Sequence, residues 1–257
     1  MMYSYGKKEG YIMKEYNIID SRLSGINDYF KIVDLFDHIA EYTNFNQKDV
    51  YDRIYQLINR EDMLEAKSVI DAVVDSQNIS KKDILIIDCE TTGLSMYKDE
   101  ILQLSMIDGE ENVIFSALFK PNRKRVWKKA ESIHHISPEL VSTCIPIQDY
   151  KREIIDLMSK YKLIVGYNIR FDLRMIEHSL ESEINCEYLD VMKGFAALKG
   201  EWDCYYQSYK LISLEDCMKL IGLNYKLHNS LEDCKCTLQC YEYLSKICLR
   251  KENKKVA

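Results

Sequence analysis

One short segment constrains this chain more than any other: the apolar run 84–87, followed at once by Asp88, Cys89 and Glu90. Four apolar residues that end in charge and a Gly-containing turn predict a buried strand. Side chains two positions apart in a strand lie on the same face, so Asp88 and Glu90 are expected side by side. Two neighbouring buried carboxylates repel each other unless a cation lies between them. The segment therefore predicts part of a metal site.

A third carboxylate is expected where a later strand gives way to a helix. The apolar run 163–165 passes into a helical pattern that Asn168 is placed to cap, which puts Asp172 in the first turn. Phe171 and Ile176 are predicted to face the core. Asp172 is then left to lie toward the edge of the sheet.

The last helix of the chain opens in a similar way. Ser230 and Asp233 resemble a capping box, so Asp233 also lies in a first turn, where the helix macrodipole favours a carboxylate. His228 stands just before this helix, five residues ahead of Asp233, where a loop can bring its imidazole over the metal site.

Together these segments resemble the three motifs of the DEDDh 3′–5′ exonuclease family. The chain has Asp-x-Glu with Thr-Thr-Gly, then Asn-x-x-Phe-Asp, then His-x-x-x-x-Asp. The family includes the proofreading epsilon subunit of bacterial DNA polymerase III, ribonuclease T and oligoribonuclease. Segment 133–139 is similar to the family's Ile-His-Gly-Ile segment, with His135 where the family usually has Gly. Segment 189–191 is similar to the family's strand that precedes its penultimate helices. The resemblance covers roughly residues 81–250.

Each motif alone is weak. An isolated Asp-x-Glu in a chain with 41 acidic residues is more often a solvated strand end than a metal site. The three motifs nevertheless occur in the family's order, each at a predicted junction between strand and helix. Their coincidence favours the functional interpretation.

The resemblance implies a two-metal hydrolysis of phosphodiester bonds with Mg²⁺ or Mn²⁺, two divalent ions that carboxylate oxygens suit. Asp88 is expected to bridge both ions, with Glu90 and Asp233 completing the site that holds the nucleophile. Asp172 is expected to support the second ion. His228 is expected to be the general base, because an imidazole titrates near neutral pH.

The resemblance also implies a set of substrate contacts. These are expected at Thr91, Thr92, Gly93, Leu94, His134, Asn168 and Phe171. Thr91, Thr92 and Leu94 stand where family members hold the 3′-terminal nucleotide, through backbone contacts and an apolar wedge. For Leu94, a place in the ordinary core is the alternative.

The charge is distributed unevenly along the chain. Residues 1–80 hold 9 Lys/Arg and 14 Asp/Glu, and the remaining residues hold 26 Lys/Arg and 27 Asp/Glu. Neither part has an excess of basic residues, which argues against a protein that coats nucleic acid. A local basic track contains no acid and comprises Lys120, Arg123, Lys124, Arg125, Lys128 and Lys129. Steering of phosphates and an ordinary solvated loop are both open for this track. Trp127 within it either stacks on a base or packs under the loop.

The order of predicted elements indicates an α/β fold. Strands are expected at 84–89, 101–107, 113–119, 163–165 and 188–191, and helices from about 138, at 148–160, after 168, at 213–221 and at 230–249. Three meandering strands followed by strands that alternate with helices predict a mixed sheet covered by helices. With the family resemblance, the prediction is a ribonuclease H-like mixed five-stranded sheet flanked by helices, preceded by a small all-helical N-terminal segment.

Three regions are predicted along the chain. Residues 1–80 form an acidic, Tyr-rich helical region, with apolar stripes at 29–40, 50–58 and 63–74. Residues 81–250 form the exonuclease domain, and 251–257 a frayed, charged tail. The first region carries no catalytic motif, and docking to a DNA polymerase or another protein partner is one interpretation of it.

Cysteine usage and hydropathy suggest the compartment. Nine cysteines without a paired zinc framework predict a reducing, cytoplasmic environment, with the cysteines of 234–248 as small buried side chains. The start of the chain lacks the apolar core of a signal peptide, and the chain has no apolar run of about 18 residues, so no membrane contact is expected.

Three functions remain open at this point. The first is a metal-dependent 3′–5′ exonuclease that trims single-stranded DNA in proofreading or repair, and the second is a relative that acts on RNA or short oligoribonucleotides. The third is a non-catalytic module that docks on a polymerase. The presence of all four carboxylates and the histidine favours catalysis.

Overall fold

The computed structural model describes residues 61–199, 201–203, 205–206, 208–223 and 229–255. His228 and the predicted helical stripes at 29–40 and 50–58 lie outside the described residues. The third predicted stripe is confirmed as helix α4 (Glu61–Ser76). Among the described helices, none is both long and apolar enough to cross a bilayer.

The architecture is a mixed five-stranded sheet, as predicted. Its strands are β1 (Ile84–Thr91), β2 (Ile101–Asp108), β3 (Val113–Leu118), β4 (Leu163–Gly166) and β5 (Tyr188–Asp190). They lie in the order β3-β2-β1-β4-β5. The first three strands form an antiparallel meander, whereas β1, β4 and β5 run parallel because helical segments return the chain between them.

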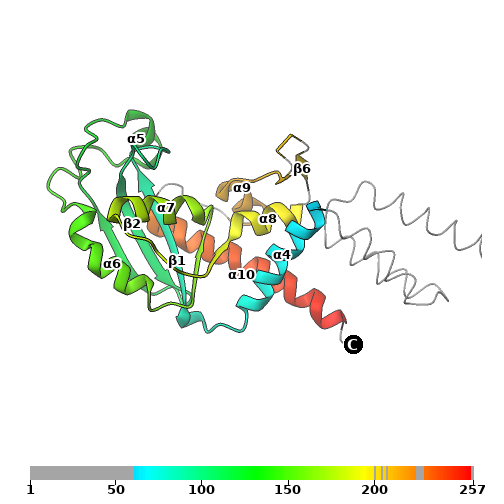
Figure 1. Ribbon diagram of the computed structural model, residues 1–257. Helices are drawn as coiled ribbons and strands as arrows, with labels where there is room; N and C mark the ends of the chain where they lie inside the picture. The colour runs from blue at the N-terminus through cyan, green and yellow to red at the C-terminus, as the bar shows by residue number, and fades with distance from the viewer. Residues whose placement is uncertain (1–60, 200, 204, 207, 224–228, 256–257) are drawn as a thin grey trace, which may run out of the picture. The chain divides into compact units, whose positions relative to one another are not determined.

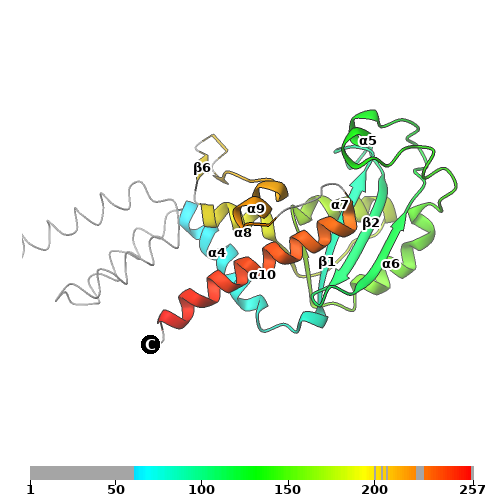
Figure 2. The same cartoon turned by 180° about the vertical axis from the view of Figure 1, so that it is seen from behind.

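Helices cover both faces of this sheet. The elements outside the sheet are η1 (Lys81–Asp83), α5 (Lys128–His134), η2 (Ile147–Tyr150), α6 (Lys151–Met158), α7 (Ile169–Leu180), α8 (Val191–Lys199), β6 (Trp202–Asp203), β7 (Ser208–Tyr209), α9 (Leu214–Leu220) and α10 (Ser230–Lys255). Figure 1 shows α6 and α7 on one face. Figure 2, seen from behind, shows α10 across the other face.

The central strand β1 is apolar on both sides because both faces are covered. Leu85 and Ile87 are fully buried and pack in one cluster with residues of α6 and α7. Ile86 points to the opposite face, where the thiol of Cys234 on α10 lies 3.7 Å from the Ile86 carbonyl oxygen. Cys234 is fully buried, which agrees with its predicted role as a small apolar side chain.

The chain divides into two compact units, one built from 1–70 with 196–210 and the other from 71–195 with 211–257. The last turns of α4 belong to the second unit. Ser76 Oγ lies 2.8 Å from Tyr241 Oη, and Gln77 Nε2 donates to Ser245 Oγ at 2.8 Å, so the end of α4 is bonded to α10. The domain boundary predicted after residue 80 stays a prediction.

Two predicted elements differ from the structure. The helix expected from about Pro138 is a series of turns, in which Ser142 and Cys144 donate their N–H groups to carbonyls three residues back. The segment is rich in Ser, Thr and β-branched residues and ends at Pro146, which cannot continue a helix. The tail expected to be frayed is helical: α10 continues to Lys255, beyond the predicted end at 249.

Candidate active site

The acidic site begins on β1, where Asp88 and Glu90 lie on one face of the strand. Across the antiparallel pair, Asp88 stands opposite Ser105 and Glu90 opposite Gln103. The register then shifts between Glu90 and Thr91. Such an irregularity bends the strand locally, directly after the second carboxylate and one residue before β1 ends at Thr91.

Helix α10 is anchored to the strand residues that face these two acids. Ser230 Oγ lies 2.7 Å from Ser105 Oγ, and the Ser230 N–H donates to Gln103 Oε1 at 3.3 Å. The helix therefore starts beside the acidic pair, and Asp233 stands one turn further on. One carboxylate oxygen from each of Asp88, Glu90 and Asp233 lies within 4.8 Å of the other two.

The cap of α10 is not the predicted one. The N–H of Leu231 donates to Asn229 Oδ1 at 3.0 Å, which makes Asn229 the capping residue. Ser230, expected to cap through its hydroxyl, is fully buried and uses that hydroxyl to bond Ser105. The prediction that Asp233 lies in the first turn of the helix is confirmed.

Asp172 reaches the site from α7. Its side chain is buried, and its Oδ1 accepts the backbone N–H of Cys89 at 3.0 Å, directly between Asp88 and Glu90. Asn168 precedes the helix but does not cap it with its side chain, because its backbone is left-handed, with φ 64°. Instead, the N–H of Asn168 donates to Asp190 Oδ1 at 3.1 Å, which fixes the start of α7.

Burial and mutual repulsion govern the charge of the acidic cluster. Burial raises the pKa of Asp88 well above its ordinary value, and the carboxylates of Asp172, Asp233 and Glu90 raise it further. Burial, with repulsion from Asp233 and Asp172, raises the pKa of Glu90 to about 8. Burial also raises the pKa of Asp172 to about 7, although the hydrogen bonds with Cys89 oppose this rise. Without a cation, the cluster therefore resists full ionisation near neutral pH.

The cluster fits hard divalent cations. Its ligand atoms are all carboxylate oxygens, which Mg²⁺ and Mn²⁺ prefer, and their separation allows several to share one ion. The nearby thiols of Cys89 and Cys234 are buried, and burial raises their pKa well above the ordinary value, so they stay protonated. Soft thiolate coordination is therefore disfavoured. We find the donor set suited to the Mg²⁺ or Mn²⁺ that the sequence predicted.

A pocket of about 710 Å³ adjoins the cluster at Glu90. Six of the seven predicted substrate contacts line it, namely Thr91, Thr92, Gly93, Leu94, His134 and Phe171. Asn168 is not among the residues that line it. Leu94 is 84% exposed, which contradicts its alternative as ordinary core and leaves an apolar side chain at the rim.

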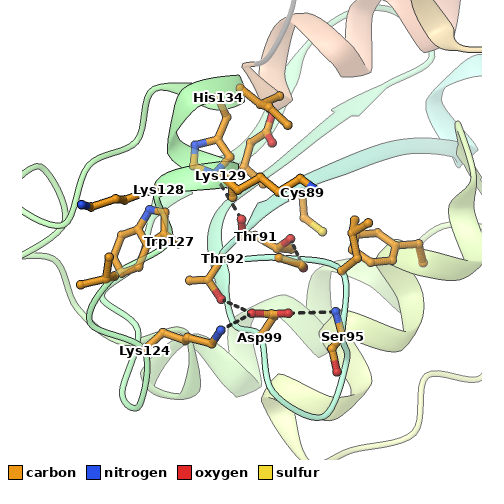
Figure 3. Close-up of a pocket in the computed structure, with 17 residues that line it drawn as sticks. Cys89, Thr91, Thr92, Ser95, Asp99, Lys124, Trp127, Lys128, Lys129 and His134 are labelled. Carbon is orange, nitrogen blue, oxygen red and sulfur yellow. Dashed lines mark hydrogen bonds and ion pairs between the residues drawn. The ribbon is translucent and has the colours of Figure 1, made fainter.

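Two histidines stand at the end of α5, and the first of them, His134, lines this pocket. His134 Nδ1 accepts the N–H of Ile136 at 3.0 Å, so its Nε2 is the donor toward the Thr91 carbonyl oxygen at 3.2 Å (Figure 3). This contact joins α5 to the residue that follows the acidic pair. His135 has φ 60°, in the left-handed region that favours glycine, at the position where the sequence departs from the family pattern.

Trp127 packs under the loop, the second of its two predicted roles. Its side chain is 5% exposed, and its Nε1 donates to the Ile136 carbonyl oxygen at 2.7 Å. Leu102 and Val141 complete the apolar cluster around it. The buried Trp127 is also one of the residues that line the pocket.

The sequence did not reveal the role of Asp99 and Glu100, a pair of acids that each expose only 7% of their surface. Asp99 accepts the Thr92 hydroxyl at 3.1 Å and the ammonium of Lys124 at 3.0 Å (Figure 3). Glu100 accepts the N–H of Lys124 at 2.7 Å. The available signal was their place directly before a fully buried strand, where ionised side chains require partners.

The profile of the RNase T family, described as an exonuclease family, matches residues 85–241. An uncharacterised exonuclease, CP81 of Escherichia phage 186, is 30% identical over 176 residues, covering 64% of this chain and 89% of the phage protein. The PolC-type DNA polymerase III of Thermotoga maritima is 24% identical over 69% of this chain, which spans only 13% of that polymerase.

Among solved structures, the zinc-bound complex of E. coli exonuclease I with single-stranded DNA has a TM-score of 0.54 and 21% sequence identity. The match covers 68% of this chain and 43% of exonuclease I, and it agrees with the ribonuclease H-like arrangement of the sheet. The profile match spans all four carboxylates and most of the chain. This protein therefore belongs to the RNase T exonuclease family, of the DEDDh type.

Proposed function

We propose that this protein is a metal-dependent 3′–5′ exonuclease that removes nucleoside monophosphates from single-stranded DNA. The observation that carries the proposal is the cluster of Asp88, Glu90 and Asp233, whose oxygens converge within 4.8 Å where a large pocket opens. DNA as the substrate is supported by the names of its relatives, a DNA polymerase and an exonuclease crystallised with single-stranded DNA.

Two Mg²⁺ or Mn²⁺ ions, when bound, would supply activation of water and stabilisation of the charge that develops on the attacking and leaving oxygens. In the proposed site, Asp88 would help to hold both ions, and Glu90 and Asp233 would be further ligands of one of them. Asp172, whose carboxylate accepts the Cys89 N–H, would support the other ion. The protein holds these oxygens in place before substrate arrives, which lowers the cost of reorganisation during the reaction.

His228 is proposed as the general base, from the sequence motif alone. It stands two residues before Ser230, whose contacts with Ser105 and Gln103 fix the start of α10. A neutral imidazole in reach of the attacking water takes up its proton, and the pKa of an ordinary histidine suits this transfer near pH 7.

The pocket is proposed to hold the 3′-terminal nucleotide. Its wall beside the acidic cluster is the turn from Thr91 to Leu94, and Thr91 Oγ1 closes that turn by donating to the Gly93 carbonyl oxygen at 2.7 Å. The exposed side chain of Leu94 and the ring of Phe171 offer apolar surface to a base. Contacts of this kind do not distinguish one base from another, which suits an enzyme that removes nucleotides one after another.

The proposal is tested with matched 5′-labelled single-stranded DNA and RNA oligonucleotides, in Mg²⁺, Mn²⁺ or EDTA, beside Asp88→Ala. We expect a metal-dependent ladder that shortens from the 3′ end, is faster on DNA, and is absent in Asp88→Ala. The variant is expected to fold, because it removes one of several repelling carboxylates.

Each alternative has its own result in this assay. Faster cleavage of RNA would replace the proposed substrate with RNA. Binding of oligonucleotide without cleavage would favour a docking module and draw attention to residues 1–80. Wild-type turnover in Asp88→Ala would disprove the metal site.

A further inference from the structure

Asp99 is a buried acid of the pocket lining, distinct from the acidic cluster. It lies in the segment that leads from the turn after β1 to the start of β2. A buried carboxylate is costly unless partners compensate its charge, so its contacts show what it holds in place.

Each oxygen of the Asp99 carboxylate binds the turn that follows the acidic pair (Figure 3). Oδ1 accepts the Thr92 hydroxyl at 3.1 Å, and Oδ2 accepts the Ser95 N–H at 2.9 Å. Thr92 is held a second time, because its Oγ1 accepts the Glu100 N–H at 2.9 Å. One side chain therefore ties together the two ends of a turn that lines the pocket.

Lys124 compensates the charge of Asp99 from the basic loop, which comprises residues 119–127 between β3 and α5. Its ammonium lies 3.0 Å from Asp99 Oδ1. The loop backbone is itself fixed, because the buried Glu100 carboxylate accepts the Lys124 N–H at 2.7 Å. The ion pair is thus held from both sides, unlike a pair between two mobile surface side chains. Although burial opposes it, the hydrogen bonds that this carboxylate accepts lower the pKa of Asp99, so it stays ionised near neutral pH.

Gly93 shows that the turn and the carboxylate are fitted to each other. Its backbone is not left-handed, so a positive φ does not explain the glycine. A Cβ at this position would lie 2.6 Å from Asp99 Oδ2 and 2.8 Å from Asp99 Cγ. The end of a side chain can often move away from such a contact, but this one is buried and bonded through both oxygens. The glycine therefore leaves room for the carboxylate.

The acidic cluster is held by other contacts. Asp88 and Glu90 belong to β1, and Asp172 accepts the Cys89 N–H. Helix α10, which carries the remaining acid, is bonded to β2. A change at Asp99 can therefore displace the turn while the metal ligands keep their places.

From these contacts we infer that Asp99 is a positioning residue, which fixes the turn 92–95 so that the 3′-terminal nucleotide is aligned with the acidic cluster. The inference rests on the proposed function and adds a residue that acts through the turn rather than on the metal ions. Alignment matters because a misplacement of about 1 Å can lower a rate by about 100-fold.

Asp99→Asn is the test variant, and Asp108→Asn is its matched control. An amide has one oxygen, so Asp99→Asn can accept from Thr92 or from Ser95 but not from both. The ammonium of Lys124, whose side chain is 37% exposed, can then turn to water, and we expect the variant to fold. Asp108 exposes the same 7% of its surface, stands at the other end of β2 and accepts backbone N–H groups of the turn to β3.

Three quantities are measured for both variants below their unfolding temperatures. They are kcat on an oligothymidylate in Mn²⁺, the affinity for Mn²⁺ alone, and the affinity for thymidine 5′-monophosphate in Mn²⁺. We expect Asp99→Asn to lower kcat by about 10- to 100-fold and the nucleotide affinity by about 3- to 10-fold, at unchanged Mn²⁺ affinity. Asp108→Asn is expected to lose stability while it keeps all three quantities.

A merely structural Asp99 would lower the unfolding temperature as Asp108→Asn does and leave kcat and nucleotide affinity at wild-type values, which would overturn the inference. Loss of Mn²⁺ affinity in Asp99→Asn would also overturn it, because Asp99 would then support the metal site. Wild-type protein that cleaves no DNA would overturn the proposed function instead. Nucleotide affinity, which requires no turnover, would still decide on Asp99.

A double-mutant cycle tests the fit between Gly93 and Asp99. We expect Gly93→Ala to weaken nucleotide binding, because its Cβ displaces the carboxylate, and to weaken it little further in Asp99→Ala, where the carboxylate is absent. Additive losses would mean that Gly93 acts on the nucleotide independently of Asp99, and would overturn the proposed positioning.

Discussion

At the scale of single residues, His135 places a side chain at a backbone position where the family usually has glycine. The residue ends α5 with φ 60° and ψ 18°, a conformation that a side chain disfavours. We expect His135→Gly to stabilise the fold by about 0.5–1 kcal/mol, because relief of the left-handed strain exceeds the added entropy of the unfolded chain. The measurement is the midpoint of denaturant unfolding at an unchanged m-value.

His135→Ala is the matched control, since alanine keeps the Cβ that causes the strain. It is expected to show no such gain. If His135→Gly instead destabilises the fold, as glycine does inside a helix, the left-handed backbone of His135 is not strained.

His228 carries the residue-scale prediction about chemistry. We expect His228→Ala to lower kcat by about 10²–10⁴, the usual contribution of a positioned acid–base group, with little change in affinity for Mn²⁺. His178→Ala serves as a control on an exposed histidine of α7, which contacts the ring of Tyr97. A collapse of metal affinity in His228→Ala would make the histidine a ligand instead of a base.

At the scale of elements, the start of α10 decides where Asp233 stands. Asn229 caps this helix through Leu231, and Asp233 N–H donates to the Asn229 carbonyl oxygen at 2.9 Å. We expect Asn229→Ala to cost about 1 kcal/mol of unfolding free energy, because the N–H of Leu231 loses its side-chain partner while the backbone bond of Asp233 remains.

Asn229→Asp keeps a capping oxygen and is the control in the same denaturation experiment. The free energies of unfolding of the two variants should differ by most of the stability that the side-chain cap contributes. Equal stabilities of the alanine and aspartate variants would mean that water satisfies the helix end, and Asn229 would then be an ordinary exposed residue.

Local periodicity predicted the sheet well, because each strand is an apolar run of ordinary length between turn residues. All five strands were expected within two residues of their observed ends. It failed between β3 and η2, where a helix was expected from Pro138 and α5 was not. There the positions are fixed by long-range contacts, Trp127 packing beneath Ile136 and Val141, which local patterns do not contain.

At the scale of the whole molecule, the sequence motifs located the four carboxylates because each stands at the end or the start of an element. They did not predict the ion pair of Asp99 with Lys124, or the attachment of the basic loop by Glu100. Those contacts join segments that are more than twenty residues apart in the sequence. The chain has 41 acidic residues, and the sequence alone does not distinguish the buried ones from the exposed ones. Burial, which only the fold reveals, distinguishes them.

The acidic cluster also predicts how the stability of the whole molecule depends on pH. Folding raises the pKa of Glu90 to about 8 and of Asp172 to about 7, and raises that of Asp88 well above its ordinary value. In the unfolded chain these carboxyls ionise near pH 4. Between about pH 4 and 8 the folded state therefore binds more protons than the unfolded state, and the free energy of unfolding falls as pH rises through this window.

A divalent cation reverses this penalty, because it favours the ionised carboxylates and binds the folded state. In EDTA we expect Tm to decrease from pH 5 to pH 8, and Asp88→Asn to flatten that decrease. Added Mn²⁺ should raise Tm more at pH 8, where the carboxyls ionise readily, than at pH 5, where protons compete for them. Glu183→Gln, which alters an exposed acid, should keep the wild-type profile. A Tm that rises with pH in EDTA would mean that the cluster is solvated like an ordinary acidic surface. The absence of any gain from Mn²⁺ at either pH would mean that the cluster binds no metal.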